Sequence, residues 1–168
     1  MISLRFLLVI LLVTLVSIAN AGETLVTFAG GRAEVVLPDN FTVVSSDASG
    51  LVATFGPKGD HKLELSLNDI ESPSDSADLG EQFVRAQAEK TGRKLSQGAG
   101  RVVFMDPAGD SKQGEVTVRV VHWQIGFGRS VVVMTLTAPV EQPMSSALQQ
   151  FLGRPLNALV ASLRRTGA

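Results

Sequence analysis

The stretch Glu115–Thr137, EVTVRVVHWQIGFGRSVVVMTLT, decides the fold that this sequence predicts. It is rich in Val, Ile, Thr, Phe and Trp, the residue types that suit a pleated, half-buried surface. The segment Gly126–Arg129 divides it into two runs, as a short glycine-containing connection in a β-hairpin does. Beyond this bend both alternating sets of residues are apolar, so we expect the second strand to be covered on both faces. The hairpin therefore predicts the centre of a sheet with something packed on each side.

Length and composition indicate one globular domain. The chain has 168 residues, of which 45% are hydrophobic and 18% charged, as in an ordinary folded protein rather than a disordered one. A formal net charge of −1 argues against nucleic acid and anionic membranes as partners, because both bind basic surfaces. The sequence contains no cysteine, which excludes disulfides, thiolate metal sites, a cysteine nucleophile and a lipid-modified N-terminal cysteine.

The N-terminus predicts an exported protein. One positive charge precedes the uncharged apolar run 6–18, and Ala19 and Ala21 occupy the positions that a signal peptidase reads. We therefore expect a secretory signal peptide over residues 1–21, cleaved after Ala21, and a single mature domain over residues 22–168. The compartment is then most simply a bacterial periplasm. The alternative is an uncleaved membrane anchor, but the apolar run is shorter than the roughly 20 residues of a spanning helix.

Most of the mature chain shows the pattern of antiparallel strands. The clearest strand covers residues 62–68, where leucines alternate with polar residues. Gly30 and Gly31 between two β-prone runs indicate a tight hairpin, because such turns need positive φ. The segment Asp106–Asp110 is predicted to be a turn. Connections of this length imply an antiparallel sheet.

Two helical regions are expected to cover this sheet. The first runs from about residue 77 to 91 and has Gly92 at the position of a C-terminal glycine cap. Its predicted core face contains Leu79, Phe83 and Ala86, with Val84 and Ala88 beside them. The second follows Pro139 and is expected to break at Pro155. The predicted fold class is α+β: an α/β/α sandwich with a central, mostly antiparallel sheet covered by helices on both faces.

No motif marks the chain as an enzyme. The motifs G-x-S-x-G, S-x-x-K, H-E-x-x-H and Walker A are absent, and the histidines are His61 and His122. The absence of these motifs does not exclude a Ser/His/Asp triad, because a triad is a spatial arrangement. However, no feature of the sequence marks a serine as activated. We therefore predict a non-enzymatic protein without catalytic residues, cofactor or metal.

One acidic segment has the residue types of a calcium site. Asp106, Asp110 and Glu115 gather around the sequence DPAGDSKQGE, and calcium prefers oxygen ligands from such loops. The spacing is not that of an EF-hand, so a solvated acidic turn is the favoured interpretation. Calcium binding by this segment stays open.

The candidate contact residues for a partner or ligand are His122, Trp123 and Gln124. The apolar pattern of the first hairpin strand changes phase around Val120, which indicates a bulge or a covering helix that stops short. Tryptophan is enriched at binding hot spots, but a core position is favoured for Trp123.

These patterns resemble the Mog1/PsbP-like fold, in particular its exported DcrB-type branch. The resemblance covers most of the mature chain and rests on Val36–Phe41, the helix ending near Gly92, the hairpin end Val133–Ala138 and the helix end Val160–Arg165. It implies an α/β/α sandwich that works by binding. Family members serve as photosystem accessory subunits, a small-GTPase partner and envelope proteins, and some periplasmic immunity proteins are similar. No site residues carry over from the family.

The expected function is therefore a non-enzymatic periplasmic protein-binding module. It would act as an envelope accessory subunit or as a toxin-neutralising immunity protein, with a protein as its partner. The alternative is a periplasmic carrier of a small ligand or metal, with a pocket between sheet and helix near His122 and Trp123. The choice between the two binding roles, the partner and the oligomeric state stay open.

Overall fold

The computed structural model describes residues 22–55, 61–70, 76–98, 101–140 and 146–166. The predicted signal peptide, residues 1–21, lies outside the described residues. Over the described ranges, no helix is both long enough and apolar enough to span a membrane.

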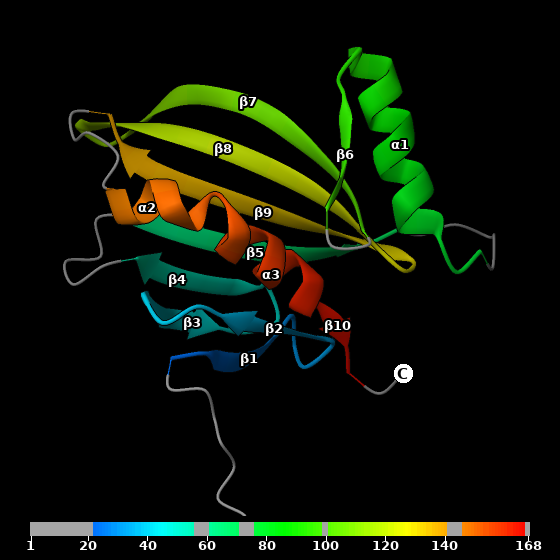
Figure 1. Ribbon diagram of the computed structural model, residues 1–168, viewed down its shortest axis with the longest axis horizontal. Helices are drawn as coiled ribbons and strands as arrows, with labels where there is room; N and C mark the ends of the chain where they lie inside the picture. Colours follow the sequence, from blue (N-terminus) through cyan, green and yellow to red (C-terminus); the bar gives the residue numbers. More distant parts are fainter. Residues whose placement is uncertain (1–21, 56–60, 71–75, 99–100, 141–145, 167–168) are drawn as a thin grey trace, which may run out of the picture.

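The strands of the described residues build two antiparallel sheets (Figure 1). A seven-stranded sheet has the order β3-β4-β5-β9-β8-β7-β6, and a three-stranded sheet has the order β1-β2-β10. The strand bounds are β1 Thr24–Phe28, β2 Ala33–Leu37, β3 Phe41–Ser46, β4 Leu51–Phe55, β5 His61–Asp69, β6 Leu95–Gly98, β7 Arg101–Gln113, β8 Val116–Phe127, β9 Ser130–Pro139 and β10 Arg164–Arg165. The predicted α+β class and mostly antiparallel sheet agree with this architecture.

The predicted hairpin is confirmed as β8 and β9, and β9 is the middle strand of the large sheet. Gly128 in the connecting turn has φ 57°, a conformation that glycine adopts without strain. The expectation that β9 is buried on both faces is correct only at its start, where Val131 and Val132 are both buried. Farther along, Thr135 and Thr137 are only half-buried.

The turn predicted at Asp106–Asp110 is wrong, because this segment lies inside β7. The pairing of β7 with β8 shifts register between Asp106 and Gly109. A β-bulge accommodates proline and an extra residue without reversing the chain, so the Pro-Ala-Gly sequence bends the strand instead of ending it.

The first helix, α1, covers Leu79–Thr91 and ends at Gly92, whose φ of 65° confirms the predicted glycine cap. Its predicted core face is correct at Val84 and Ala88, which are buried, and wrong at Phe83 and Ala86, which are exposed. Phe83 is 40% exposed, whereas the buried residues of the helix are Gly80, Val84 and Ala88. The Gly80 N–H donates to the Gly128 carbonyl oxygen at 2.8 Å, and this contact turns the Gly80 side of the helix toward the sheet.

The C-terminal helical region is broken as predicted. Helix α2 covers Ser146–Phe151, and α3 covers Arg154–Ser162 with Pro155 in its first turn. Proline is tolerated there because the first helical N–H groups have no partner within the helix.

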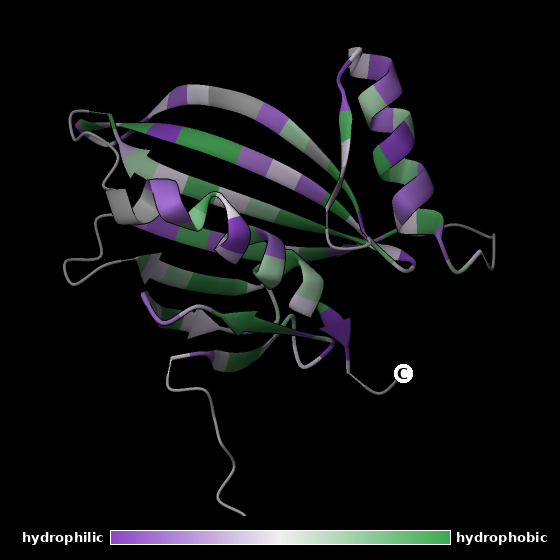
Figure 2. Cartoon of the chain, viewed as in Figure 1, coloured by the Kyte–Doolittle hydropathy of each residue, from purple (hydrophilic) through white to green (hydrophobic). Residues whose placement is uncertain are grey.

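Among the described residues, two separate hydrophobic clusters form the core. One joins β2, the large sheet and α3, and it contains Trp123, Met134 and Leu159; the other joins Val84 of α1 to Val131. Because successive residues of a strand point to opposite faces, Val131 and Val132 assign these clusters to opposite sides of the sheet. Figure 2 shows the corresponding alternation of hydrophobic and hydrophilic residues along the strands.

Candidate functional site

The three candidate contact residues are neighbours on β8, so the strand separates them onto two faces. Trp123 is 6% exposed and belongs to the cluster that contains α3, which confirms its predicted core position. His122 and Gln124 point to the opposite face, where His122 is exposed and Gln124 is half-buried. The structure therefore divides the predicted contact site into two surfaces.

The first surface lies on the His122 face, on the part of the sheet beyond α1. Strand pairing places Glu64, Thr135 and His122 in one row across the sheet, and Lys62, Thr137 and Val120 in the next. We call these six residues the open sheet face. They border a hollow of about 510 Å³, which continues along β7 from Gly109 to Gln113.

Hydrogen bonds and an ion pair order the open sheet face. His122 Nδ1 lies 2.9 Å from Thr135 Oγ1, and Lys62 Nζ lies 2.9 Å from Glu64 Oε2. A hydroxyl beside an imidazole supplies two of the three groups of a catalytic triad. Within the described residues, no carboxylate forms a hydrogen bond with His122.

The acidic residues of the candidate calcium segment are separated by the strand geometry. Asp106 Oδ1 lies 3.0 Å from Arg93 Nη1, and Asp110 Oδ1 lies 3.2 Å from Arg119 Nε. Each of these two carboxylates therefore has an arginine partner. Among the residues that the structure describes, no three His, Cys, Asp or Glu side chains gather to hold a metal ion.

The second surface is an apolar cleft between the β6–β8 part of the sheet and α3. We call it the Trp123 cleft, and its volume is about 560 Å³. Its lining residues are Arg93, Lys94, Leu95, Ser96, Val103, Met105, Trp123, Leu156, Asn157 and Val160. Val103, Trp123 and Val160 are buried, whereas Met105 is 54% exposed.

Arg101 holds α3 against the sheet beside the Trp123 cleft. Its Nε donates to the Val160 carbonyl oxygen at 3.2 Å, and its Nη2 donates to the Leu163 carbonyl oxygen. Its guanidinium carbon lies 4.9 Å from the centre of the Phe127 ring, within the range of a cation–π contact. Burial lowers the pKa of Arg101 from its usual value, because the charged form loses hydration.

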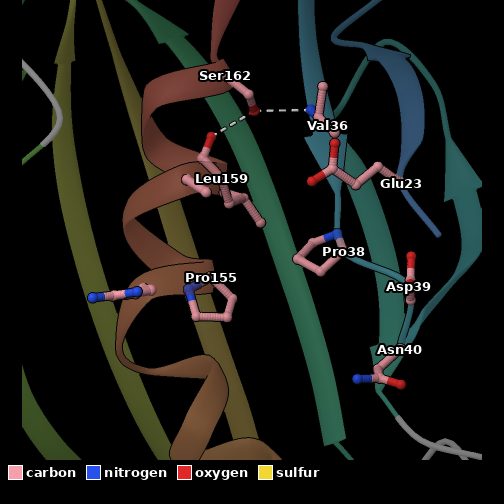
Figure 3. A pocket seen from close by; sticks show the side chains of 10 residues that line it. Glu23, Val36, Pro38, Asp39, Asn40, Pro155, Leu159 and Ser162 are labelled. Carbon is pink, nitrogen blue, oxygen red and sulfur yellow. Dashed lines mark hydrogen bonds between the residues drawn. The ribbon is translucent and has the colours of Figure 1, made fainter. Parts of the chain in front are cut away.

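A third cavity, of about 740 Å³, lies between β2 and α3 (Figure 3). Ser162 Oγ accepts a hydrogen bond from the Val36 N–H at 2.9 Å and donates one to the Leu159 carbonyl oxygen at 2.7 Å. The hydroxyl therefore acts as both acceptor and donor, and its hydrogen bond with Val36 joins α3 to β2. Pro38 and Asp39 line the same cavity, so part of the Val36–Phe41 segment that resembles the family forms its wall.

Sequence reasoning missed most of the residues that line the Trp123 cleft. Lys94 follows the helix cap, Met105 lies in β7, and Leu156 comes from α3. Nothing local in the sequence indicates that these three segments converge. The one available signal is Trp123, the single tryptophan of the chain.

Comparisons with known proteins find similarity at the level of structure. No family model and no curated protein matches the chain. A structure from Bacteroides thetaiotaomicron aligns with 10% identity and a TM-score of 0.60 over 86% of this chain and 48% of that one. The two proteins therefore share a fold, and this chain spans about half the length of that structure.

Two further solved structures are similar over most of both chains. The Ran-binding protein Mog1p of Saccharomyces cerevisiae has 16% identity and a TM-score of 0.45, over 84% of this chain and 94% of its own. Cyanobacterial PsbP (CyanoP) from Synechocystis has 11% identity and a TM-score of 0.38, over 89% of this chain and 96% of its own.

Proposed function

We propose that this protein is a non-enzymatic, exported protein-binding module of the Mog1/PsbP-like fold, in its DcrB-type branch. In the periplasm it acts as an envelope accessory subunit or as a toxin-neutralising immunity protein. The observation that carries the proposal is the open sheet face, where central strands of the large sheet present His122 and Thr135 to solvent.

The open sheet face has the properties of a preorganised protein contact. Its residues come from β5, β8 and β9, which are held by neighbours on both sides, so little backbone ordering is needed on binding. It combines both signs of charge with hydroxyl groups and the half-buried Val120, a polar and apolar mixture typical of non-obligate interfaces.

The same proposal includes the complete α/β/α sandwich, with helices covering both faces of the sheet. The packing of α1 on one face and of α3 in the cluster of the other supports it. The open sheet face then lies where α1 no longer covers the sheet, and a docked partner would complete the layer.

Site-specific photo-crosslinking in the cells that make the protein tests the docking surface. A photoreactive amino acid at position 122 should give a discrete covalent adduct, and the same probe at Val44, which is 61% exposed on β3, should not. Excess unlabelled protein should abolish the adduct, whereas the competitor Thr135→Arg should not. Equal adducts from both positions, or equal competition by Thr135→Arg, would refute docking at this face.

The identity of the cross-linked protein separates the two binding roles. A secreted toxin in the adduct supports immunity, and a subunit of an envelope complex supports the accessory role. The partner can be identified by mass spectrometry of the purified adduct.

A second candidate function, a small-ligand carrier, rests on a different observation. The Trp123 cleft has a volume within the roughly 300–1,000 Å³ range of small-molecule sites and a mostly apolar lining. Native mass spectrometry of the protein purified from its source tests this function, because a carrier should retain ligand mass and a variant with a filled cleft should not.

A further inference from the structure

We propose that the Trp123 cleft binds an amphiphile with a single apolar chain and an anionic head group. This inference rests on the carrier function and names its ligand class. It is independent of protein docking, since Trp123 and His122 lie on opposite faces of the sheet.

The floor and mouth of the cleft suit an apolar chain. Val103, Trp123 and Val160 form a buried apolar floor, and Leu156 packs beside it. Met105 extends this apolar surface to the mouth, where it is 54% exposed. An alkyl chain lying in the cleft would remove the Met105 side chain and the cleft walls from water, which is the main source of affinity for apolar ligands.

The charges around the cleft select the head group. Among the described residues, the lining contains two cations, Arg93 and Lys94, and no acidic residue. Arg93 is paired with Asp106, but Lys94 is exposed and forms no ion pair with any described residue. An anionic head group would pair with the Lys94 ammonium, whereas a cationic head group would be repelled by it.

The Trp123 indole supplies a second polar contact. Trp123 lines the cleft, and its N–H forms no hydrogen bond with another described residue. Buried tryptophans usually satisfy this donor, and an acceptor oxygen of the ligand would do so here.

The two other cavities described above lack this combination. The hollow of the open sheet face is lined by Lys62 together with Glu64 and Asp110, so its charges are mixed. The cavity between β2 and α3 contains Glu23 and Asp39 as well as Arg154, so its charges are also mixed. Of these three cavities within the described residues, the Trp123 cleft alone joins an apolar floor to cations without acids.

The single tryptophan provides a direct readout, because its emission reports on the cleft alone. The purified protein is titrated with dodecanoate and dodecyl phosphate below their micelle concentrations, and with dodecyltrimethylammonium and acetate as controls. We expect a saturable, single-site change in Trp123 emission for the anionic amphiphiles, binding at least about tenfold weaker for the cationic one, and no change with acetate. The tighter of the two anions identifies the head group as carboxylate or phosphate.

Matched charge variants test the role of Lys94. Lys94→Gln should weaken dodecanoate binding a fewfold, and Lys94→Glu should weaken it by roughly tenfold, as expected for an exposed ion pair and its reversal. Met105→Glu at the exposed mouth should also weaken it. Lys112→Glu, at an exposed position elsewhere on β7, should leave binding unchanged.

The outcomes distinguish failure of the proposed ligand class from failure of the carrier function. If both charge types bind equally, or if Lys94→Glu binds dodecanoate as well as the unaltered protein does, the anionic class is wrong while the carrier function stands. If no amphiphile produces a saturable change, the proposed ligand class is wrong, and native mass spectrometry then decides the carrier function. Cross-linking from position 122 tests protein docking independently, because His122 lies on the opposite face of the sheet from the Trp123 cleft.

Discussion

At the residue scale, two glycines determine how closely α1 approaches the central hairpin. A Cβ atom added to Gly80 would lie 1.8 Å from the Ser130 carbonyl oxygen, and one added to Gly126 would lie 2.7 Å from the Glu81 Cα. Both clashes involve backbone atoms, which cannot rotate away. The absence of a side chain at these two positions therefore brings the first turn of the helix onto the β8–β9 hairpin.

The Gly80→Ala substitution should destabilise the protein although alanine is the better helix former. The gain in helix propensity is about 1 kcal/mol, whereas forcing an extra carbon into this contact costs roughly 1–3 kcal/mol or more because the backbone must shift. Urea unfolding measures the net change. Gly109→Ala is the matched control, because a Cβ there has no atom within 4 Å. Unchanged or increased stability of Gly80→Ala would contradict this packing.

A second residue-scale prediction concerns the turn at Asp47. The side-chain hydrogen bond from Ser49 is the main cause that lowers the pKa of Asp47, followed by the Ser49 N–H at 2.7 Å. Because the folded-state pKa is depressed, the stabilisation is present above the unfolded-state value of about 3.9 and is lost as pH falls through the folded-state pKa. The stability difference between the unaltered protein and Asp47→Ala should therefore shrink from pH 6 to pH 3. Urea midpoints across this range measure it, and a constant difference would refute the linkage.

At the element scale, α1 is amphipathic in sequence but uses a different face from the one that its largest side chains indicate. Leu79, Phe83 and Ala86 form the apolar stripe that periodicity suggests. The structure instead packs the row Gly80, Val84 and Ala88 against the sheet. Small side chains let the helix axis lie closer to the sheet than phenylalanine would. The row of smaller residues, Gly80, Val84 and Ala88, is therefore the one that is buried.

Two adjacent alanine substitutions distinguish these faces. Val84 is 0% exposed, so Val84→Ala should lose about 2 kcal/mol of stability through lost burial and a residual cavity. Phe83→Ala should lose less than about 1 kcal/mol, because the ring is already 40% exposed. Thermal or urea unfolding of both variants provides the comparison. A larger loss for Phe83→Ala would show that the Leu79–Phe83 face is the buried one.

At the scale of the whole molecule, the large sheet carries two different surfaces on its two sides. The α3 side contains the larger core cluster and, at its edge, the Trp123 cleft. The α1 side is packed near the β8–β9 turn and presents the open sheet face beyond it. The two proposed binding functions can therefore operate without sharing a residue.

The predicted export signal is also tested at the scale of the whole chain. We expect the protein isolated from the cell envelope to begin at Gly22, because Ala19 and Ala21 form a small-residue cleavage site. Ala21→Arg should block processing and leave the apolar segment attached. N-terminal sequencing and intact-mass measurement of both proteins test this. A mature protein that begins at Met1 would contradict cleavage.

The sequence by itself determined the features that depend on local chemistry. Alternating apolar residues predict the strands, positive φ explains the glycine at the end of α1, and the missing N–H of Pro155 explains the break between α2 and α3. The β8–β9 hairpin and the core position of Trp123 follow from the same local patterns. Each of these signals is contained within a few neighbouring residues.

Only the tertiary structure decided which side of α1 is buried, how β7 passes Pro107, and what surrounds Trp123. Helix rotation depends on the contact of Gly80 with Ser130, 50 positions away along the chain. The β7 bulge depends on pairing with β8. The Trp123 cleft needs Lys94, Met105 and Leu156 from three separate elements. Contacts between distant segments leave no periodic signal in a single sequence, because each segment satisfies its own local pattern wherever its partner lies.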